Sequence, residues 1–315
     1  MKSRTLLLVF AISVILQGCG VREVKNLLCD VESFIYERPD SALAILDTMD
    51  RSSLSTPGLR AHHALLHAMA LDKNYIDVTD DSLARIAVDY YSKHGPKKYE
   101  ARSRYYLGLS YYYREDYNNA IIEFTKAESP ALESDSLYLG MLKVVQADTY
   151  AKTYNVIEEY NYLLQAHDIF KALGNSYYYQ AVMLRLSQTY SNNGDDGKAE
   201  EIIEELLSIS TYDNLISSAL VSYAFINVSK STPDLRLADE IYRRNYNDYQ
   251  GDNMTVQHYW AWAYSLASTG KESEAQSIIN QLEDNTVHSS YWKYLISKSK
   301  GDISTSFNYL ETYLN

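Results

Sequence analysis

The stretch from Tyr105 to Ala127 constrains the fold of this chain more than any other part of its sequence. It carries two stripes of residues at helical spacing, one at i, i+1 and i+4 and one at i, i+4 and i+7. These stripes are Leu107, Gly108 and Tyr111, followed by Ala120, Phe124 and Ala127. Small Gly108 and Ala120 let two helix backbones approach each other, while the larger side chains fill the space around that contact. The stretch therefore predicts a closely packed helix hairpin.

The small residue of the second helix recurs along the chain. Matching positions are 31 to 46 residues apart, a spacing typical of helical repeats. They are Ala42, Ala84, Ala120, Ala166, Ala199, Ala238, Ala275 and Ser306. Because one hairpin cannot bury its apolar face alone, neighbouring hairpins must stack into a continuous array. We therefore expect about eight hairpins over residues 24–315, with longer turns at residues 74–79 and 153–159.

These motifs identify the chain as a member of the tetratricopeptide repeat (TPR) superfamily, and the match covers nearly all of residues 24–315. The resemblance implies an all-α fold, a right-handed α-solenoid in which the first helix of each hairpin lines a concave face. More narrowly, residues 38–47 (RPDSALAILD) and 70–91 (ALDKNYIDVTDDSLARIAVDYY) resemble a family of bacterial TPR lipoproteins. Some members of that family also carry a membrane helix, a coiled coil and a DNA-binding module, and those activities are not carried over to this sequence.

The N-terminal residues have the pattern of an export signal. Lys2 and Arg4 precede an uncharged apolar run over residues 6–16, which is too short to span a bilayer. The following Leu-Gln-Gly-Cys at residues 16–19 resembles a bacterial lipobox, which implies cleavage before Cys19 and acylation of that thiol. We therefore expect a lipoprotein signal peptide over residues 1–18, a lipidated tether over residues 19–23 and membrane anchoring through Cys19. An ordinary secretory signal with an incidental cysteine is the alternative.

The residues after Cys19 bear on the location of the anchored protein. No acidic run follows Cys19, and Gly20 occupies the next position, which by analogy favours the periplasmic face of the outer membrane. The other cysteine, Cys29, lies within an apolar helical pattern and is expected to be packed rather than reactive.

Composition and motifs argue against several classes of function. The formal net charge of −12 argues against nucleic-acid binding, which needs a basic stripe. His63 and His67 have zinc-ligand spacing, but residue 64 is Ala where a HExxH motif has Glu, so we interpret them as structural. Residues 192–203 fail the EF-hand pattern, and no phosphate-binding loop or nucleophile motif appears. We expect no catalytic residue, metal or cofactor.

What remains is a recognition surface. Tyrosine is unusually frequent, with 31 copies, and it serves either as a packing residue or as a recognition residue with low entropic cost. Side chains opposite the packing stripe of the first helices are expected to line the concave groove. The candidates are Arg102, Tyr105, Leu109, Tyr112, Tyr113, Trp260 and Tyr264. The Lys and Asn pairs of the TPR proteins that grip a peptide carboxylate are not found.

The leading hypothesis is a non-enzymatic, lipid-anchored TPR scaffold that binds a protein or peptide partner in the bacterial cell envelope. One alternative is a carbohydrate-binding envelope lipoprotein, since Tyr and Trp rings can stack on sugars. Another is the sensory TPR portion of a regulator whose effector module lies elsewhere.

Overall fold

The structure, a computed structural model, describes residues 20–282 and 287–314. Within these residues every regular element is a helix and no strand is formed. The predicted signal peptide and Cys19 lie outside the described residues. The chain divides into two compact units, one ending at Ile169 and the other beginning at Phe170.

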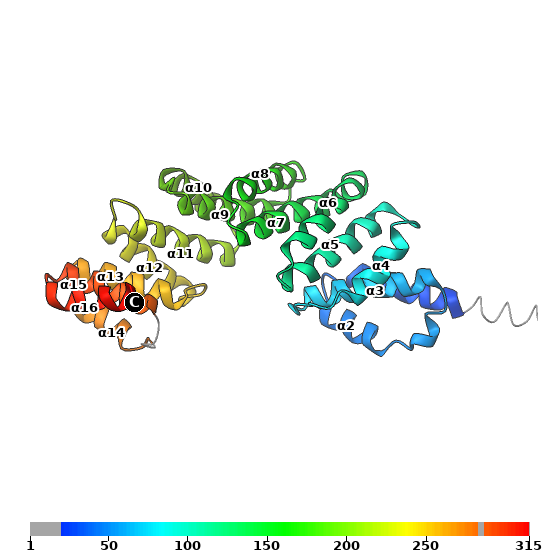
Figure 1. Ribbon diagram of the computed structural model, residues 1–315, viewed down its shortest axis with the longest axis horizontal. Helices are drawn as coiled ribbons and strands as arrows, with labels where there is room; N and C mark the ends of the chain where they lie inside the picture. Colours follow the sequence, from blue (N-terminus) through cyan, green and yellow to red (C-terminus); the bar gives the residue numbers. More distant parts are fainter. Residues whose placement is uncertain (1–19, 283–286, 315) are drawn as a thin grey trace, which may run out of the picture. The chain divides into compact units, whose positions relative to one another are not determined.

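Unit 1 is built from helix hairpins, and from α2 to α7 each helix packs on the next one along the chain (Figure 1). Its helices are a first helix over residues 20–34, α2 (Pro39–Thr48), α3 (Pro57–Lys73), α4 (Ser82–Tyr91), α5 (Lys97–Tyr113), α6 (Tyr117–Ser134), α7 (Ser136–Lys152) and α8 (Val156–Ala172), of which α8 crosses the boundary. A short 3-10 turn, η1 (Arg51–Ser53), lies between α2 and α3. Helices α3, α5 and α7 also contact one another in turn, as stacked hairpins require.

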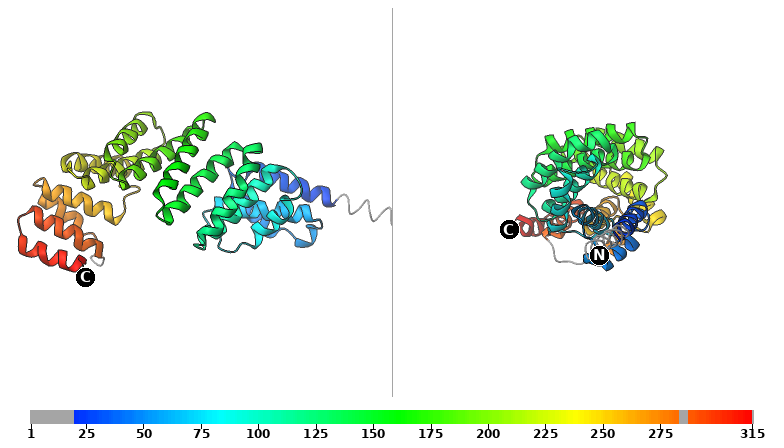
Figure 2. Two further views of the ribbon diagram at one scale, coloured as in Figure 1. Left: turned by 45° about the horizontal axis from the view of Figure 1, so that its top comes forward. Right: turned by 90° about the vertical axis from the view of Figure 1, so that its right-hand side faces the viewer.

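Unit 2 repeats the same arrangement with four further hairpins in its described residues (Figure 2). Its helices are α9 (Ser176–Asn192), α10 (Asp196–Ile209), α11 (Asp213–Ser229), α12 (Leu235–Tyr249), α13 (Val256–Ser268), α14 (Glu272–Ile279), α15 (Val287–Ser299) and α16 (Ile303–Leu314). The first helices of its hairpins, α9, α11, α13 and α15, contact one another in sequence. The all-α array of TPR-like hairpins that the sequence predicts is therefore confirmed.

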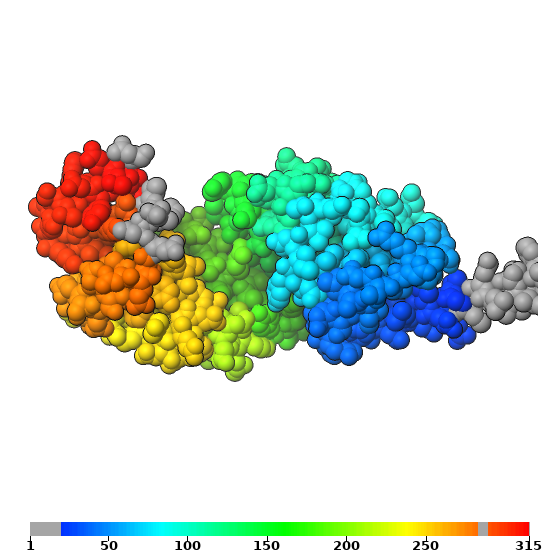
Figure 3. All heavy atoms as spheres, turned by 90° about the horizontal axis from the view of Figure 1, so that it is seen from below, coloured from blue at the N-terminus to red at the C-terminus, as the bar shows by residue number. Residues whose placement is uncertain are grey.

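The small residues of the second helices hold the hairpins together. All eight predicted positions are buried, with no more than 6% of any residue exposed. A Cβ atom added to Gly108 would lie 2.3 Å from Cε1 of Phe124, so only glycine fits opposite that ring. In the space-filling view, side chains fill the gaps between consecutive hairpins of each unit (Figure 3). The close helix packing at small residues that the Tyr105–Ala127 stretch predicts is therefore present in the structure.

Six of the turns that join the two helices of a hairpin contain one residue with a positive φ angle. These residues are Tyr75, Glu115, Tyr154, Gly194, Gly270 and Gly301. Glycine adopts this left-handed conformation freely, whereas other residues pay for it with steric strain. Gly194 has a φ of 77°, and no heavy atom lies within 4 Å of where its Cβ would be. Conformation alone therefore favours glycine at this position.

Two expectations are corrected by the structure. Helix α8 begins at Val156, so only residues 153–155 separate it from α7, in place of an extended link over residues 153–159. The Asn155 side chain accepts a hydrogen bond from the backbone N–H of Glu158 at 3.3 Å and so starts the helix early. Cys29 is exposed rather than packed, because Leu28 and Val31 take the inward positions of the first helix.

The turn conformation gives a first prediction. Gly194→Ala should lower the free energy of unfolding by about 1 kcal/mol, because alanine is strained in the left-handed region. Tyr154→Ala is the matched control: Tyr154 is 92% exposed and already lies at a positive φ without glycine, so it should change stability much less. Urea denaturation followed by circular dichroism measures the free energy of unfolding of both variants. An equal decrease in the two would contradict the role given to the left-handed conformation of Gly194.

Candidate functional site

Three of the seven residues predicted to line a groove are buried. Tyr105, Leu109 and Trp260 each have at most 7% of their surface exposed. The Tyr105 ring packs against Phe124 and Tyr138, with ring centroids 6.2 and 5.5 Å away. Tyr105 and Leu109 therefore belong to the packed interior, and the prediction that they face an open groove is corrected. Trp260 is packed as well, although it borders a cavity of about 490 Å³ beside Lys293 and Tyr309.

Arg102, also predicted to face the groove, is held by carboxylates of its own unit. Its Nη2 lies 2.8 Å from Oδ2 of Asp135, and its Nη1 lies 3.4 Å from Oε1 of Glu32. The guanidinium carbon sits 4.7 Å from the ring centroid of Tyr138. The charge of Arg102 is therefore compensated within unit 1.

Tyr112 and Tyr113 are half-buried at the C-terminal end of α5. Their rings meet edge to face with centroids 5.7 Å apart. Tyr113 and Leu109 line a crevice of about 30 Å³, which is about the volume of one water molecule. This crevice is too small to take a peptide side chain.

The first helix of the chain contacts the face of unit 1 on which Arg102 lies. Glu32 accepts hydrogen bonds from the hydroxyl of Tyr99 at 2.7 Å and from Nζ of Lys98 at 3.4 Å, and it lies 3.3 Å from Nε2 of His62. Burial alone would raise the pKa of the Glu32 carboxyl. The hydrogen bonds with His62 and Tyr99, together with the charge of Lys98, outweigh burial and lower the pKa from its ordinary 4.5 to about 2.

A chain of tyrosine hydroxyls extends the same contact. Tyr36, in the turn after the first helix, lies 2.9 Å from the hydroxyl of Tyr138 on α7. Tyr138 in turn lies 3.1 Å from the hydroxyl of Tyr106 on α5. The N-terminal segment of the chain thus contacts α3, α5 and α7, and it occupies part of the face that these first helices were expected to offer to a ligand.

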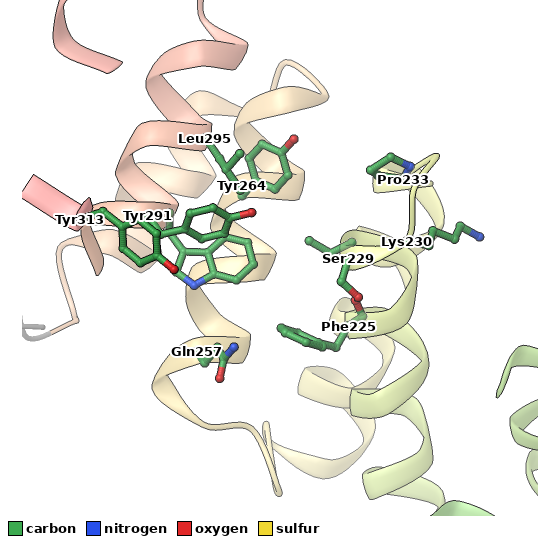
Figure 4. Close-up of a pocket in the computed structure, with 11 residues that line it drawn as sticks. Phe225, Ser229, Lys230, Pro233, Gln257, Tyr264, Tyr291, Leu295 and Tyr313 are labelled. Carbon is green, nitrogen blue, oxygen red and sulfur yellow. The ribbon is translucent and has the colours of Figure 1, made fainter. Parts of the chain in front are cut away.

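Unit 2 has an open cavity of about 470 Å³ beside its first helices. We call this cavity the aromatic groove. Its walls come from α11, α13, α15 and α16, and Figure 4 shows Phe225, Ser229 and Pro233 on one side facing Tyr264, Tyr291 and Tyr313 on the other. Tyr264 is the one predicted groove residue that lines it. The volume lies within the range of small-ligand pockets.

The aromatic rings of the groove contact one another, and parts of the tyrosine rings remain accessible to a ligand. Ring centroids are 5.3 Å apart between Tyr291 and Tyr313, and 5.6 Å apart between Tyr291 and Trp292. Trp292 also contacts Tyr264 at 6.2 Å and Phe225 at 6.4 Å. Trp292 is buried at the base of this cluster, whereas Tyr291 and Tyr313 are 38% and 37% exposed. The groove therefore has a fixed floor and accessible aromatic walls.

The polar groups of the groove are mostly uncharged. Among its lining residues Lys230 is the one cation, and its Nζ lies 2.7 Å from both Oε1 of Glu200 and Oδ1 of Asn227. Gln257 is exposed at the rim and can donate and accept hydrogen bonds, as the tyrosine hydroxyls can. The arrangement can accommodate an apolar side chain and hydrogen-bond a backbone, and it offers no free charge to a ligand carboxylate.

Sequence reasoning missed Phe225, Tyr291, Trp292 and Tyr313. The aromatic positions shift along the helices: Phe225 is the thirteenth residue of α11, Tyr264 the ninth of α13 and Tyr291 the fifth of α15. The position of the groove aromatic thus moves by about one helical turn toward the N-terminus of each successive first helix. It therefore does not occupy the same position in every repeat. Aromatic residues on three consecutive first helices were the available signal.

The three clustered histidines of α3 each contact an element that precedes α3. His62 lies beside Glu32, His63 Nε2 lies 3.0 Å from the carbonyl oxygen of Leu46, and His67 Nε2 lies 2.9 Å from Oδ1 of Asp47. In the described residues, no group of three or more His, Cys, Asp or Glu side chains is arranged to hold a metal ion. No helix of that same part of the chain is long and apolar enough to cross a membrane.

The Glu32 contacts predict a pH-dependent stability. The carboxyl has a pKa of about 2 in the folded chain and an ordinary value of 4.5, so its stabilisation is present above pH 4.5 and is lost as the pH falls toward 2. Glu32→Gln should lower the free energy of unfolding at neutral pH by on the order of 2 kcal/mol, and the gap to the wild type should shrink as the pH falls.

Chemical denaturation at several pH values tests this. Glu201→Gln removes an exposed carboxylate of α10 and serves as the control, with little expected change. A gap between Glu32→Gln and the wild type that stays constant from neutral pH to pH 3 would refute the role assigned to Glu32.

Comparisons with known proteins agree on the fold. No protein-family model matches the chain, and no curated protein matches its sequence. The chain is similar to the apo form of the quorum sensor NprR from B. thuringiensis, with a TM-score of 0.62 and 14% identity over 96% of both chains. A Rap protein complexed with Competence and Sporulation Factor gives a TM-score of 0.57 and 13% identity, covering 94% of this chain and 85% of that one.

A third similar structure is NprR in complex with its cognate peptide NprX, with a TM-score of 0.51 and 16% identity over 93% of this chain and 87% of that one. At these identities the likeness shows the fold alone. The chain is a TPR-like α-solenoid.

Proposed function

We propose that this protein is a non-enzymatic, lipid-anchored TPR protein that binds a peptide, or a peptide-like segment of a protein partner, in the bacterial cell envelope. The aromatic groove of unit 2 is the proposed binding site. The observation that carries the proposal is a cavity of about 470 Å³ with accessible tyrosine walls on the first-helix side of the hairpins.

The chemistry of the groove favours an uncharged, apolar segment. Tyr264, Tyr291 and Tyr313 provide large contact areas at low conformational cost, and such residues dominate binding energy in interfaces. Because Lys230 is already paired with Glu200, a free C-terminal carboxylate would find no unpaired cation there. The proposed ligand therefore binds through internal apolar or aromatic side chains and through its backbone.

The structural comparisons support the same class of partner. NprR, which shares the fold over most of the chain, is described in complex with its cognate peptide NprX. Transfer of this ligand class to the present chain rests on the groove, since a shared fold does not specify function.

The location is proposed from the lipobox at residues 16–19. Acylation of Cys19 would anchor the array through several acyl chains, which is sufficient for stable attachment without a membrane-spanning helix. We place the anchored protein at the periplasmic face of the outer membrane.

The groove gives a direct prediction. Peptides selected by panning a random library on the mature chain should bind the variant Tyr291→Ala/Tyr313→Ala at least about tenfold more weakly, because two aromatic contacts are lost. Fluorescence anisotropy with labelled peptides measures the affinity. Tyr154→Ala removes a tyrosine of unit 1 that is 92% exposed, more than either groove tyrosine, and should bind as the wild type does.

The same assay separates the alternatives. Equal affinity of the groove variant and the wild type would refute the site. Failure to select any peptide, together with retention of envelope polysaccharide by the wild type and its loss in the groove variant, would replace peptide binding by glycan binding.

Lipid anchoring is tested independently. Cys19→Ser should remove incorporation of an alkyne-labelled fatty acid and move the protein from the membrane fraction to the soluble fraction after cell breakage. Cys29→Ser retains the lipobox cysteine and should remain membrane-bound. Fatty-acid labelling that persists in Cys19→Ser would contradict the proposal.

A further inference from the structure

A second cavity, in unit 1, has a composition unlike that of the aromatic groove. It has a volume of about 480 Å³ and lies between α2, α3 and α4. Two arginines, Arg51 and Arg60, line it together with His63, His67 and the apolar side chains of Leu83 and Ile86. We call it the arginine cavity.

The two guanidinium groups are not neutralised by the protein. Neither Arg51 nor Arg60 forms an ion pair with a carboxylate of the described residues, and Arg60 donates one hydrogen bond from Nη1 to the carbonyl oxygen of Leu54 at 3.0 Å. Arg85, Arg102 and Arg104 of the same unit each pair with a carboxylate. In a chain with a net charge of −12, two uncompensated arginines at one cavity indicate a site for an anion.

The other polar groups of the cavity are already engaged. His63 Nε2 lies 3.0 Å from the carbonyl oxygen of Leu46, and burial lowers the pKa of His63, which favours its neutral form. Asp47, the one carboxylate of the lining, lies 2.9 Å from His67. Two guanidiniums and one carboxylate line the cavity, so its formal charge is +1 on the same convention that gives the chain −12. A monoanion complements this charge.

The loop that carries Arg51 is ordered by its own hydrogen bonds. Asp50 accepts a hydrogen bond from the backbone N–H of Ser52 at 2.9 Å, and its carbonyl oxygen accepts one from Oγ of Ser53 at 2.6 Å. Leu54 is buried and fixes the end of the loop. The connection between α2 and α3 takes residues 49–56, whereas Asp135 alone joins α6 to α7. The repeat does not need this extra 3-10 turn, which places Arg51 at the cavity.

The cavity also has an apolar wall. Leu83 and Ile86 come from α4, and Ile86 leaves 45% of its surface exposed beside the arginines. A ligand that covered Ile86 would bury apolar area while its charged end reached the guanidiniums.

We propose that the arginine cavity binds a small monocarboxylate with an apolar body. Arg51 and Arg60 hold the carboxylate, and Leu83 and Ile86 contact the apolar part. The carboxylate comes either from a free organic acid or from the C-terminus of a peptide, since both present the same chemistry. The site is separate from the aromatic groove and does not depend on the function proposed for it.

The test is isothermal titration calorimetry on the mature chain carrying Cys19→Ser, with hexanoate as the organic acid and N-acetyl-leucine as the peptide C-terminus. We expect at least one of them to bind with a Kd on the order of 1 mM or tighter. Their neutral amides should bind at least about tenfold more weakly, because the charged hydrogen bonds are lost. The stronger of the two acids identifies the source.

Variants locate the site. Arg51→Gln should weaken the binding about tenfold or more, and within the described part of the chain it breaks no ion pair. Arg60→Gln should do the same, while Arg38→Gln, an exposed arginine of the same unit, should bind as the wild type does. The proposal is overturned if neither acid binds, if the amides bind as well as the acids, if Arg51→Gln retains full affinity, or if inorganic phosphate binds more tightly than both acids.

Discussion

The close approach of two helices at a small residue is the contact on which the rest of this structure depends. Phe124 packs directly against the backbone at Gly108, where no side chain larger than hydrogen fits. On the second helix of this hairpin Ala120 is buried, as are the corresponding small residues of the other second helices, so each hairpin brings a small residue to its helix contact. This packing uses one stripe of every first helix and leaves the opposite face to be covered by neighbouring segments or to remain open.

This opposite face is partly covered in unit 1 and open in unit 2. In unit 1 the N-terminal segment covers part of the first-helix face, with Glu32 bound by Tyr99, Lys98 and Arg102 and with Tyr36 joined to Tyr138. In unit 2 the corresponding face carries the aromatic groove, whose floor is Trp292 and whose walls remain accessible. In unit 1 the ion pairs and hydrogen bonds of Glu32 cover part of the first-helix face. In unit 2 exposed aromatic side chains line it.

The sequence was sufficient to predict the hairpins because their determinants are local. The Leu-Gly-Tyr and Ala-Phe-Ala stripes act within about 20 residues, and Gly174 and Gly194 mark turns by their own conformation. Which faces are covered depends on contacts between distant residues, such as Glu32 with Arg102 and Tyr36 with Tyr138, which are 70 and 102 positions apart. For that reason Tyr105, Leu109 and Trp260 were placed in a groove although they are buried, and of the predicted residues only Tyr264 lines the aromatic groove.

The most direct measurement of the central claim is hydrogen–deuterium exchange of the mature protein with and without a peptide selected by binding. The account predicts slower exchange in α11, α13 and α15, around Phe225, Tyr264 and Tyr291, and unchanged exchange in α5 and α7. Protection confined to α5 and α7 would contradict it, because the ligand would then occupy the face that the N-terminal segment covers.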